Sequence, residues 1–401
     1  MTRVVPAFSL TRQAKHPYIP FRLFLTWVFM RKENAMALNT APAGSPASGL
    51  LKSLVKGRTV NVHAHVLSPK WWPANPTRPP GWEATPDERR YAQEARARRK
   101  EDQAALEAAL SEQKKKEYAA RAERLRKAGT LEEQAACYLL EMDEAGLDLM
   151  VNHTMDHSEF PGFAGRMYAL PFEQVLEECA GLKERFPDRF EMFAGVDPRR
   201  GRAGVKLFER AVVEFGALGL GEMVSTQWRT MPNDKKLCYP FYEKAAELGV
   251  PLMQDATMDL GFSRPYLFEQ MARDFPTLKI CLGGCGAGVA PVLGPQGLMP
   301  AHDAMLILAE AHENVWLDLD DWQRRDLEGI RVFAGFVRRA LSGPARRRIM
   351  FGSDYPVFAN LYTERDWIET VLQEAQNEGP PLSEQDLTLF FSENALRFLG
   401  L

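Results

Sequence analysis

Short apolar runs that alternate with helix-forming segments constrain the fold of this chain more than any other feature. Such alternation predicts repeated βα units on a parallel sheet. Eight units in succession favour a closed, TIM-type (β/α)8 barrel over an open doubly wound sheet, and no GxGxxG motif follows a strand. The strands are predicted at residues 59–65, 147–153, 190–196, 217–224, 250–256, 278–284, 314–320 and 348–354. Helices are predicted between them, for example at residues 172–185, 204–215, 239–248 and 301–312.

One segment interrupts this rhythm. Residues 83–130 are dense in Glu, Arg, Lys and Ala, which predicts a surface helix or helical hairpin with few apolar anchors. The segment lies on the first βα loop, so we expect it at the face where barrel active sites form. A lid or a subunit contact is one interpretation, and a solvated insertion is the other.

The barrel domain is predicted to span residues 51–401, preceded by a disordered leader and linker at residues 1–50. The apolar run at 20–30 is shorter than the roughly 20 residues that a bilayer requires. Residues 39–49 are rich in Ala, Pro, Ser and Gly and indicate a flexible linker. A disordered leader, or an extension upstream of a natural start at Met36, is favoured over a targeting segment.

Composition narrows the class of partner. A net charge of −3 gives no general attraction to nucleic acid or an anionic membrane, and the basic residues of 83–130 are interleaved with acids. Five scattered cysteines show no paired framework, which favours a reducing, cytoplasmic location. We therefore expect a small-molecule substrate and, as a further possibility, a homo-oligomer.

The residues that bear chemistry lie at the two ends of the predicted barrel. His63 and His65 close the first strand, and alternate strand residues point to the same side, so both imidazoles can bind one metal ion. Asp354 closes the eighth strand, where Gly352 permits close backbone approach. Its carboxylate can bind the metal, accept a proton from water, or do both. Two unrelated histidines and a helix-capping aspartate are the alternatives.

The chain resembles the amidohydrolase-related branch of the amidohydrolase superfamily, which includes decarboxylases of the aminocarboxymuconate semialdehyde type. The resemblance covers residues 59–401 apart from the insertion. The motifs that carry it are VNVHAHV, YLLEMDEAGLDLMV, FPDRFEMFAGVDP, PNDKKLCYPFYEKAAELGVPL, FPTLKICLGGCG, NVWLDL, RIMFGSDYPV and ENALRFLGL. It implies the barrel fold and a metal-dependent activity, but no particular substrate.

The chain departs from the family at two positions. The resemblance implies a metal-binding histidine at the end of strand five and another at the end of strand six. This sequence has Asp255, beside Gln254, at the first position and Gly284, followed by Cys285, at the second.

Three hypotheses follow for the metal. In the first, one divalent ion, preferably Zn²⁺ with Mn²⁺ or Fe²⁺ as alternatives, is held by His63, His65, Asp354 and a substitute carboxylate. Asp255 is the leading substitute and Glu222, at the end of strand four, is the second. In the other two hypotheses, His153 or His157 replaces a missing histidine, or the metal site is lost.

Aromatic residues cluster on the predicted mouth loops and suggest a substrate pocket. We assign Trp72, Trp228, Arg229 and His153 to substrate binding, with Arg229 pairing a substrate carboxylate. The alternative is ordinary packing at the rim of the barrel.

The function predicted from these features is hydrolysis of a small aromatic or carboxylate-bearing substrate through a metal-activated water, with Asp354 as proton acceptor. Non-oxidative decarboxylation is the first alternative, although the resemblance implies that it depends on the missing strand-six histidine. A catalytically inactive barrel that serves as a binding subunit is the second.

Overall fold

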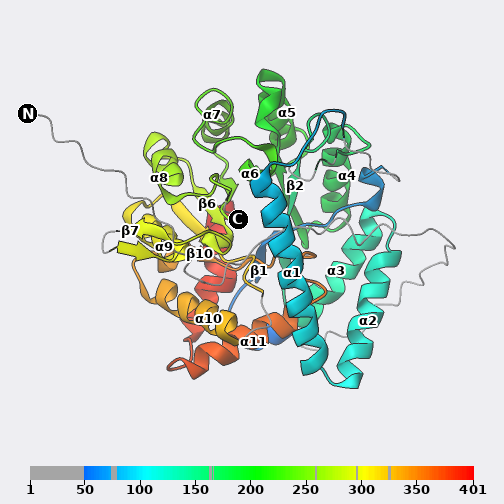
Figure 1. Cartoon of the computed structure of the whole chain (residues 1–401), viewed down its shortest axis with the longest axis vertical. Helices are drawn as coiled ribbons and strands as arrows, with labels where there is room; N and C mark the ends of the chain where they lie inside the picture. The colour runs from blue at the N-terminus through cyan, green and yellow to red at the C-terminus, as the bar shows by residue number, and fades with distance from the viewer. Residues whose placement is uncertain are drawn as a thin grey trace, which may run out of the picture.

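Eight parallel strands form the barrel of the computed structural model, which describes residues 49–401 except 74–78, 162–164, 166, 258–259, 295–296 and 324–326 (Figure 1). The strands pair in the order β1-β2-β3-β4-β5-β6-β9-β10. Their bounds are β1 Val60–Ala64, β2 Leu149–Met155, β3 Phe190–Gly195, β4 Gly219–Met223, β5 Leu252–Asp255, β6 Ile280–Gly283, β9 Val315–Asp318 and β10 Ile349–Met350. The Val62 amide donates to the Phe351 carbonyl at 3.0 Å, and Ala64 bridges in parallel to Tyr355, so the last strand returns to the first. The predicted barrel is confirmed.

Helices surround the barrel and connect its strands. They are α3 Leu131–Ala145, α4 Phe172–Arg185, α5 Arg202–Val213, α6 Ser225–Trp228, α7 Tyr239–Leu248, α8 Pro265–Asp274, α9 Ala301–Ala311, α10 Leu327–Ser342, α11 Glu364–Asn377, α12 Glu384–Thr388 and α13 Asn394–Leu399. Short 3-10 turns occur at Leu50–Ser53, Pro69–Trp71, Pro198–Arg200, Gly284–Gly286 and Arg346–Arg348, and a π-helical turn spans Leu389–Glu393. Local sequence explains the ends of α3, because Thr130 and Glu133 form a capping box and Gly146 takes the left-handed conformation at its end.

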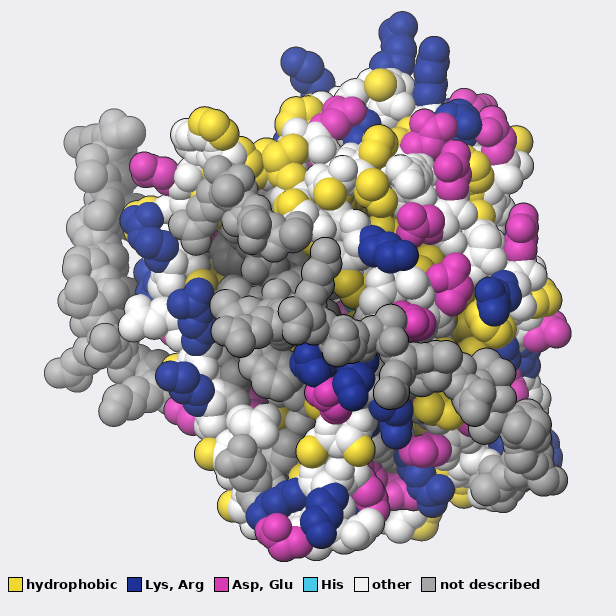
Figure 2. Space-filling view, turned by 90° about the vertical axis from the view of Figure 1, so that its right-hand side faces the viewer, with side chains coloured by type: hydrophobic (Ala, Val, Ile, Leu, Met, Phe, Trp, Pro, Cys, Tyr) yellow, Lys and Arg dark blue, Asp and Glu magenta, His cyan; other side chains and the backbone are white. Residues whose placement is uncertain are grey.

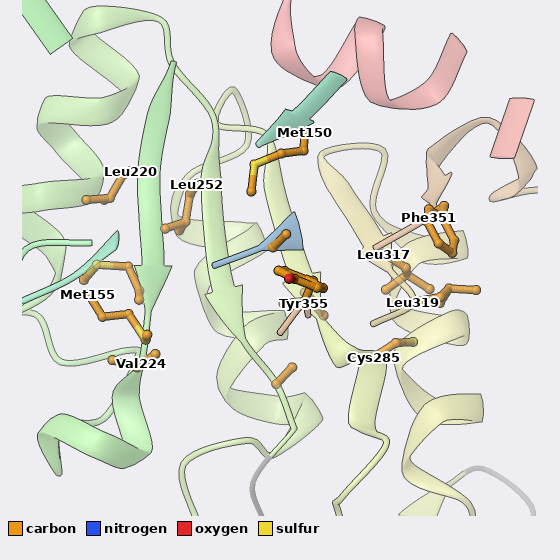
Figure 3. Packing of buried hydrophobic residues seen from close by; sticks show 14 of the residues in the cluster. Met150, Met155, Leu220, Val224, Leu252, Cys285, Leu317, Leu319, Phe351 and Tyr355 are labelled. Atoms are coloured by element: carbon orange, nitrogen blue, oxygen red, sulfur yellow. The ribbon is translucent and has the colours of Figure 1, made fainter. Parts of the chain in front are cut away.

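Both faces of the barrel sheet are buried, and the strand side chains therefore belong to two hydrophobic cores, one inside the barrel and one outside it. Val60, Val62, Leu149 and Val151 point into the barrel, where Phe398 of α13 joins them. Met150, Leu220, Leu252, Leu317 and Phe351 pack in the layer between strands and helices (Figure 3). The two-residue alternation of Leu149, Met150 and Val151 between these cores follows from the pleat of a strand.

The insertion is a helical hairpin, as predicted, formed by α1 Pro86–Ala109 and α2 Glu112–Lys127. Helix α1 runs across the front of the barrel in Figure 1. Its Tyr91 packs with Val357, which follows β10, and its Glu88 pairs with Arg229, which follows β4. Tyr118 of α2 donates to Asp366 of α11 at 2.7 Å. The hairpin is therefore anchored to the loops at the carboxyl ends of the strands.

Some predicted bounds are corrected by the structure. The eighth strand was expected at 348–354, but β10 ends at Met350 and Asp354 has a φ of 50°, which an extended strand does not allow. The hairpin of β7 Val292–Gly294 and β8 Gly297–Met299 was not predicted, because three-residue strands leave almost no periodic signal.

The surface carries charges of both signs. Figure 2 shows basic and acidic side chains interspersed over the face that it presents. Within the described residues, no helix is both long enough and apolar enough to cross a membrane. The leader predicted at 1–50, including its apolar run, lies outside the described residues except for its last two.

Candidate metal centre

Two histidine side chains meet at the end of β1. The Nε2 atoms of His63 and His65 lie 3.2 Å apart, and the two residues are 0% and 1% exposed. Strand β1 departs from regular pairing with β2 between Asn61 and Ala64, and such irregularities redirect side chains. The predicted convergence of the two imidazoles on one point is what the structure shows.

The Nδ1 atom of each imidazole ring has a hydrogen-bond partner. His63 Nδ1 lies 2.7 Å from Asp318 Oδ2, and His65 Nδ1 lies 2.8 Å from the backbone carbonyl of His153. A carboxylate and a carbonyl accept these hydrogen bonds, so each Nδ1 carries a proton, and Nε2 of each ring is the atom that can bind a metal ion once it is deprotonated. Outer partners of this kind fix the tautomer and orientation of metal-binding histidines.

Two carboxylates face the same point, one from β4 and the other from the segment that follows β10. Asp354 Oδ1 lies 2.9 Å from His65 Nε2 and 4.0 Å from His63 Nε2. Glu222 Oε2, on β4, lies 3.6 Å from His65 Nε2 and 3.7 Å from His63 Nε2. The four residues supply two nitrogen and two oxygen donors, a mixed set that suits Zn²⁺, Mn²⁺ or Fe²⁺.

A glycine makes this close approach possible. A Cβ atom on Gly352 would lie 2.2 Å from Asp318 Oδ1 and 2.8 Å from His63 Cβ. The loop beyond it is tied to β1, because the Asp354 amide donates to the His63 carbonyl at 2.9 Å. Only a residue without a side chain lets β10 approach His63 while Asp318 bonds to its ring.

The two positions that lack the family histidines are filled in another way. Asp255 is buried at the end of β5, and its Oδ1 accepts hydrogen bonds from Thr257 N at 3.0 Å and Thr257 Oγ1 at 2.6 Å. Gly284 has a φ of 68°, and a Cβ atom there would lie 1.9 Å from Thr257 Cγ2. Thr257 thus occupies the space that a side chain at 284 would need. Of the two predicted substitutes, the structure brings Glu222, rather than Asp255, within 4 Å of both imidazoles.

Three acidic residues at the end of β9 were not singled out in the sequence. Asp318, Asp320 and Asp321 are each at most 2% exposed. Besides the bond from Asp318, Asp320 Oδ2 lies 3.5 Å from His63 Nδ1. The signal that could have found Asp318 and Asp320 is their alternate spacing at the end of a buried strand, the same pattern that marks the two histidines.

These charges shift one another's protonation. Burial lowers the pKa of His63, but the fields of Asp320 and Glu222 and the hydrogen bond to Asp318 outweigh it, so the pKa of His63 stands well above its ordinary value. Burial raises the pKa of Asp320 well above its ordinary value, and it also raises the pKa of Asp318. Buried carboxylates require protons, cationic partners or metal ions.

His153 lies beside the centre, in β2. Its Nε2 donates to the Val62 carbonyl at 2.9 Å, and its ring centroid lies 4.5 Å from that of His63. Burial lowers the pKa of His153 well below its ordinary value, and the neighbouring His63 and His65 lower it further. In this structure the neutral ring supports the wall of the barrel, and Nε2 is occupied by the Val62 carbonyl.

The other residues assigned to substrate binding lie on the loops around the mouth. Trp72 packs against Tyr168, with ring centroids 4.6 Å apart, and Trp228 Nε1 donates to the Asp156 carbonyl at 2.9 Å. Arg229 Nε and one terminal nitrogen lie 2.7 Å from the two oxygens of Glu88. Trp228 is 1% exposed, so in this structure it packs in the rim.

The fold and this site define a (β/α)8 barrel with a cluster of histidine and carboxylate side chains at the carboxyl ends of its strands. The sequence model of an amidohydrolase family matches residues 60–401, and the chain belongs to that family. No curated protein matches the sequence significantly.

Solved structures share the fold at low sequence identity. A probable 2-pyrone-4,6-dicarboxylic acid hydrolase from Acinetobacter baumannii is 14% identical with a TM-score of 0.50, covering 86% of this chain and 100% of that one. A putative amidohydrolase from Staphylococcus aureus is 14% identical with a TM-score of 0.50, covering 68% and 93%. A manganese-bound 5-carboxyvanillate decarboxylase from Novosphingobium aromaticivorans is 14% identical with a TM-score of 0.46, covering 66% and 80%.

Proposed function

We propose that the protein is a metal-dependent hydrolase that acts on a small aromatic or carboxylate-bearing substrate. The observation that carries this proposal is the convergence of four atoms, namely His63 Nε2, His65 Nε2, Glu222 Oε2 and Asp354 Oδ1. The Nδ1 atom of each imidazole ring has a hydrogen-bond partner away from this point. The donor set fits a divalent ion, because two neutral imidazoles and two carboxylates match its charge and preferred ligands. A barrel kept only for binding has no need of this arrangement.

The metal ion would supply Lewis acidity, which lowers the pKa of water and polarises the scissile bond. In this proposal Asp354 accepts the proton of the attacking water and later returns it to the leaving group. Asp318 accepts the hydrogen bond of His63 Nδ1, and the His153 carbonyl accepts that of His65 Nδ1, so each ring would bind the ion through a deprotonated Nε2.

Arg229 is our proposed anchor for a substrate carboxylate. Its two-pronged pairing with Glu88 demonstrates the geometry with which this guanidinium binds a carboxylate. A substrate carboxylate would take the place of Glu88, and Trp72 would line the same mouth. In the proposal, binding of the substrate therefore displaces the beginning of α1.

Hydrolysis is preferred to decarboxylation because position 284, where the resemblance implies a histidine, has its space filled by Thr257. The test is product analysis of the metal-loaded protein with aromatic lactones, amides and acids in ¹⁸O-labelled water. We expect ¹⁸O in a product carboxylate, abolished by Asp354→Asn and retained by Asp197→Asn, whose buried carboxylate pairs with Arg199. Release of CO₂ without ¹⁸O in the organic product would contradict hydrolysis, and metal-loaded protein inert toward every class would favour a binding subunit.

A further inference from the structure

A second group of carboxylates adjoins the proposed metal centre. Asp320, Asp321 and Asp354 each offer one oxygen, and these three oxygens lie within 4.8 Å of one another. The three residues are 2%, 2% and 0% exposed. Asp320 and Asp321 follow β9, whereas Asp354 follows β10, so neighbouring strands bring these acids together at the mouth.

Among the residues that the structure describes, two buried acceptor atoms of this segment have no hydrogen-bond donor. Asp320 Oδ2 faces His63 Nδ1 at 3.5 Å, whereas its Oδ1 is buried without a hydrogen-bond partner among the described residues. Gln323 donates from Nε2 to the carbonyl of Ser353 at 2.7 Å, next to Asp354. Its amide oxygen is also buried and lacks a hydrogen-bond partner within the part of the chain that the structure describes. Buried oxygens in this state call for a cation or a proton.

The negative charge of the whole cluster also favours the binding of cations. The group near the two histidines has five carboxylates, each at most 2% exposed, which belong to Glu222, Asp318, Asp320, Asp321 and Asp354. One divalent ion balances two negative charges, and a second ion or protons on the carboxylates would balance the others. Uncompensated charges in a buried site are strongly unfavourable.

We propose that a second divalent cation binds between Asp320, Asp321 and Asp354, next to the ion held by His63 and His65, with Asp354 common to both. The proposal rests on the metal centre of the proposed function and goes beyond it. All donors of the second site are carboxylate oxygens, so it takes a hard ion such as Mn²⁺ or Mg²⁺. The competing account of the same charges is a single ion with a proton on Asp320.

The test is a titration of metal-free full-length protein with MnCl₂, with bound manganese measured by equilibrium dialysis and elemental analysis. We expect about two Mn²⁺ per chain at saturation and a spin-coupled manganese signal in electron paramagnetic resonance spectra. Asp320→Asn should lower the stoichiometry to about one and abolish the coupling, because the first centre keeps its four ligands. The matched control is Asp197→Asn, which removes a buried carboxylate at the end of β3 and should leave both ions bound.

Saturation at one Mn²⁺ per chain in the wild type would overturn the second site and assign the balancing charge to a proton on Asp320. Two ions retained by Asp320→Asn would also overturn it. No bound manganese at all would overturn the first centre, and with it the proposed function, so the two failures are distinguishable. If Asp320→Asn does not fold, Asp321→Asn serves the same purpose, and the wild-type stoichiometry stands without either variant.

Discussion

The hydrogen bond between Asp318 and His63 gives the sharpest prediction, because it acts on the metal without touching it. Asp318 Oδ2 lies 2.7 Å from His63 Nδ1, and both side chains are 0% exposed. Asp318→Asn keeps the volume but removes the charge that holds the proton on Nδ1 and makes Nε2 more basic. Loss of such an outer partner typically weakens metal affinity about 10–100-fold, which is about 1.4–2.7 kcal/mol.

The assay is competition between the protein and a chromogenic chelator for Zn²⁺ at fixed pH, which reports the dissociation constant of the tighter site. Asp197→Asn is again the matched control, since Asp197 is 1% exposed and pairs with Arg199 rather than with a histidine. A dissociation constant for Asp318→Asn that equals that of the control, with the bound zinc unchanged, would refute the reasoning. His63 would then need no charged partner to act as a ligand.

Three further predictions concern the packing, the titration and the insertion. Gly352→Ala should cost about 1–3 kcal/mol of unfolding free energy in urea and weaken zinc binding, because its Cβ would lie 2.2 Å from Asp318 Oδ1. Burial raises the pKa of Glu364 from 4.5 to about 7. The folded state therefore holds a proton that the unfolded state releases, and stability should fall by about 3 kcal/mol as pH rises from 4.5 to 7, a slope that Glu364→Gln removes. Glu88→Gln should free Arg229 and speed amide hydrogen exchange at the start of α1 roughly 5–30-fold, equivalent to about 1–2 kcal/mol.

Each of these has a control and a contradicting result. Gly181→Ala, inside α4 with nothing within 4 Å of its Cβ position, should stabilise the protein, and an equal gain for Gly352→Ala would contradict the close approach. Stability that rises between pH 4.5 and 7, or a slope that Glu364→Gln leaves intact, would contradict the account of Glu364. Asp87→Asn removes an exposed ion pair with Arg90 one residue before Glu88, and exchange equal in both variants would show that Glu88 does not hold α1.

The sequence was sufficient for the barrel because every strand is buried on both faces and so reads as an apolar run. It also predicted that His63, His65 and Asp354 lie together, since residues at the ends of barrel strands converge regardless of the loops, and their role as metal ligands stays a prediction. The hairpin of β7 and β8 was not predicted because its strands are too short to show the two-residue alternation of a β-strand. The eighth strand was predicted to be longer than β10 because the chain from Phe351 to Tyr355 still forms backbone hydrogen bonds with the β1 segment after β10 has ended.

The partners of the centre depended on directions that spacing does not give. Asp255 ranked above Glu222 because it stands at the aligned position, yet its carboxylate bonds to Thr257 while Glu222 faces both histidines. Asp318 and Asp320 looked like the end of a strand, and only the fold shows that they lie beside His63. The pairing of Arg229 with Glu88 joins residues 141 positions apart, which no local pattern could indicate.

The central claim is that His63, His65, Glu222 and Asp354 hold a divalent ion. The most direct measurement is a crystal structure of the zinc-loaded protein, with anomalous diffraction recorded above and below the zinc absorption edge. The account predicts an anomalous peak about 2.0–2.2 Å from His63 Nε2, His65 Nε2, a Glu222 oxygen and an Asp354 oxygen. A peak coordinated by Asp255 with Glu222 turned away, or no peak at the two histidines in zinc-saturated crystals, would contradict it.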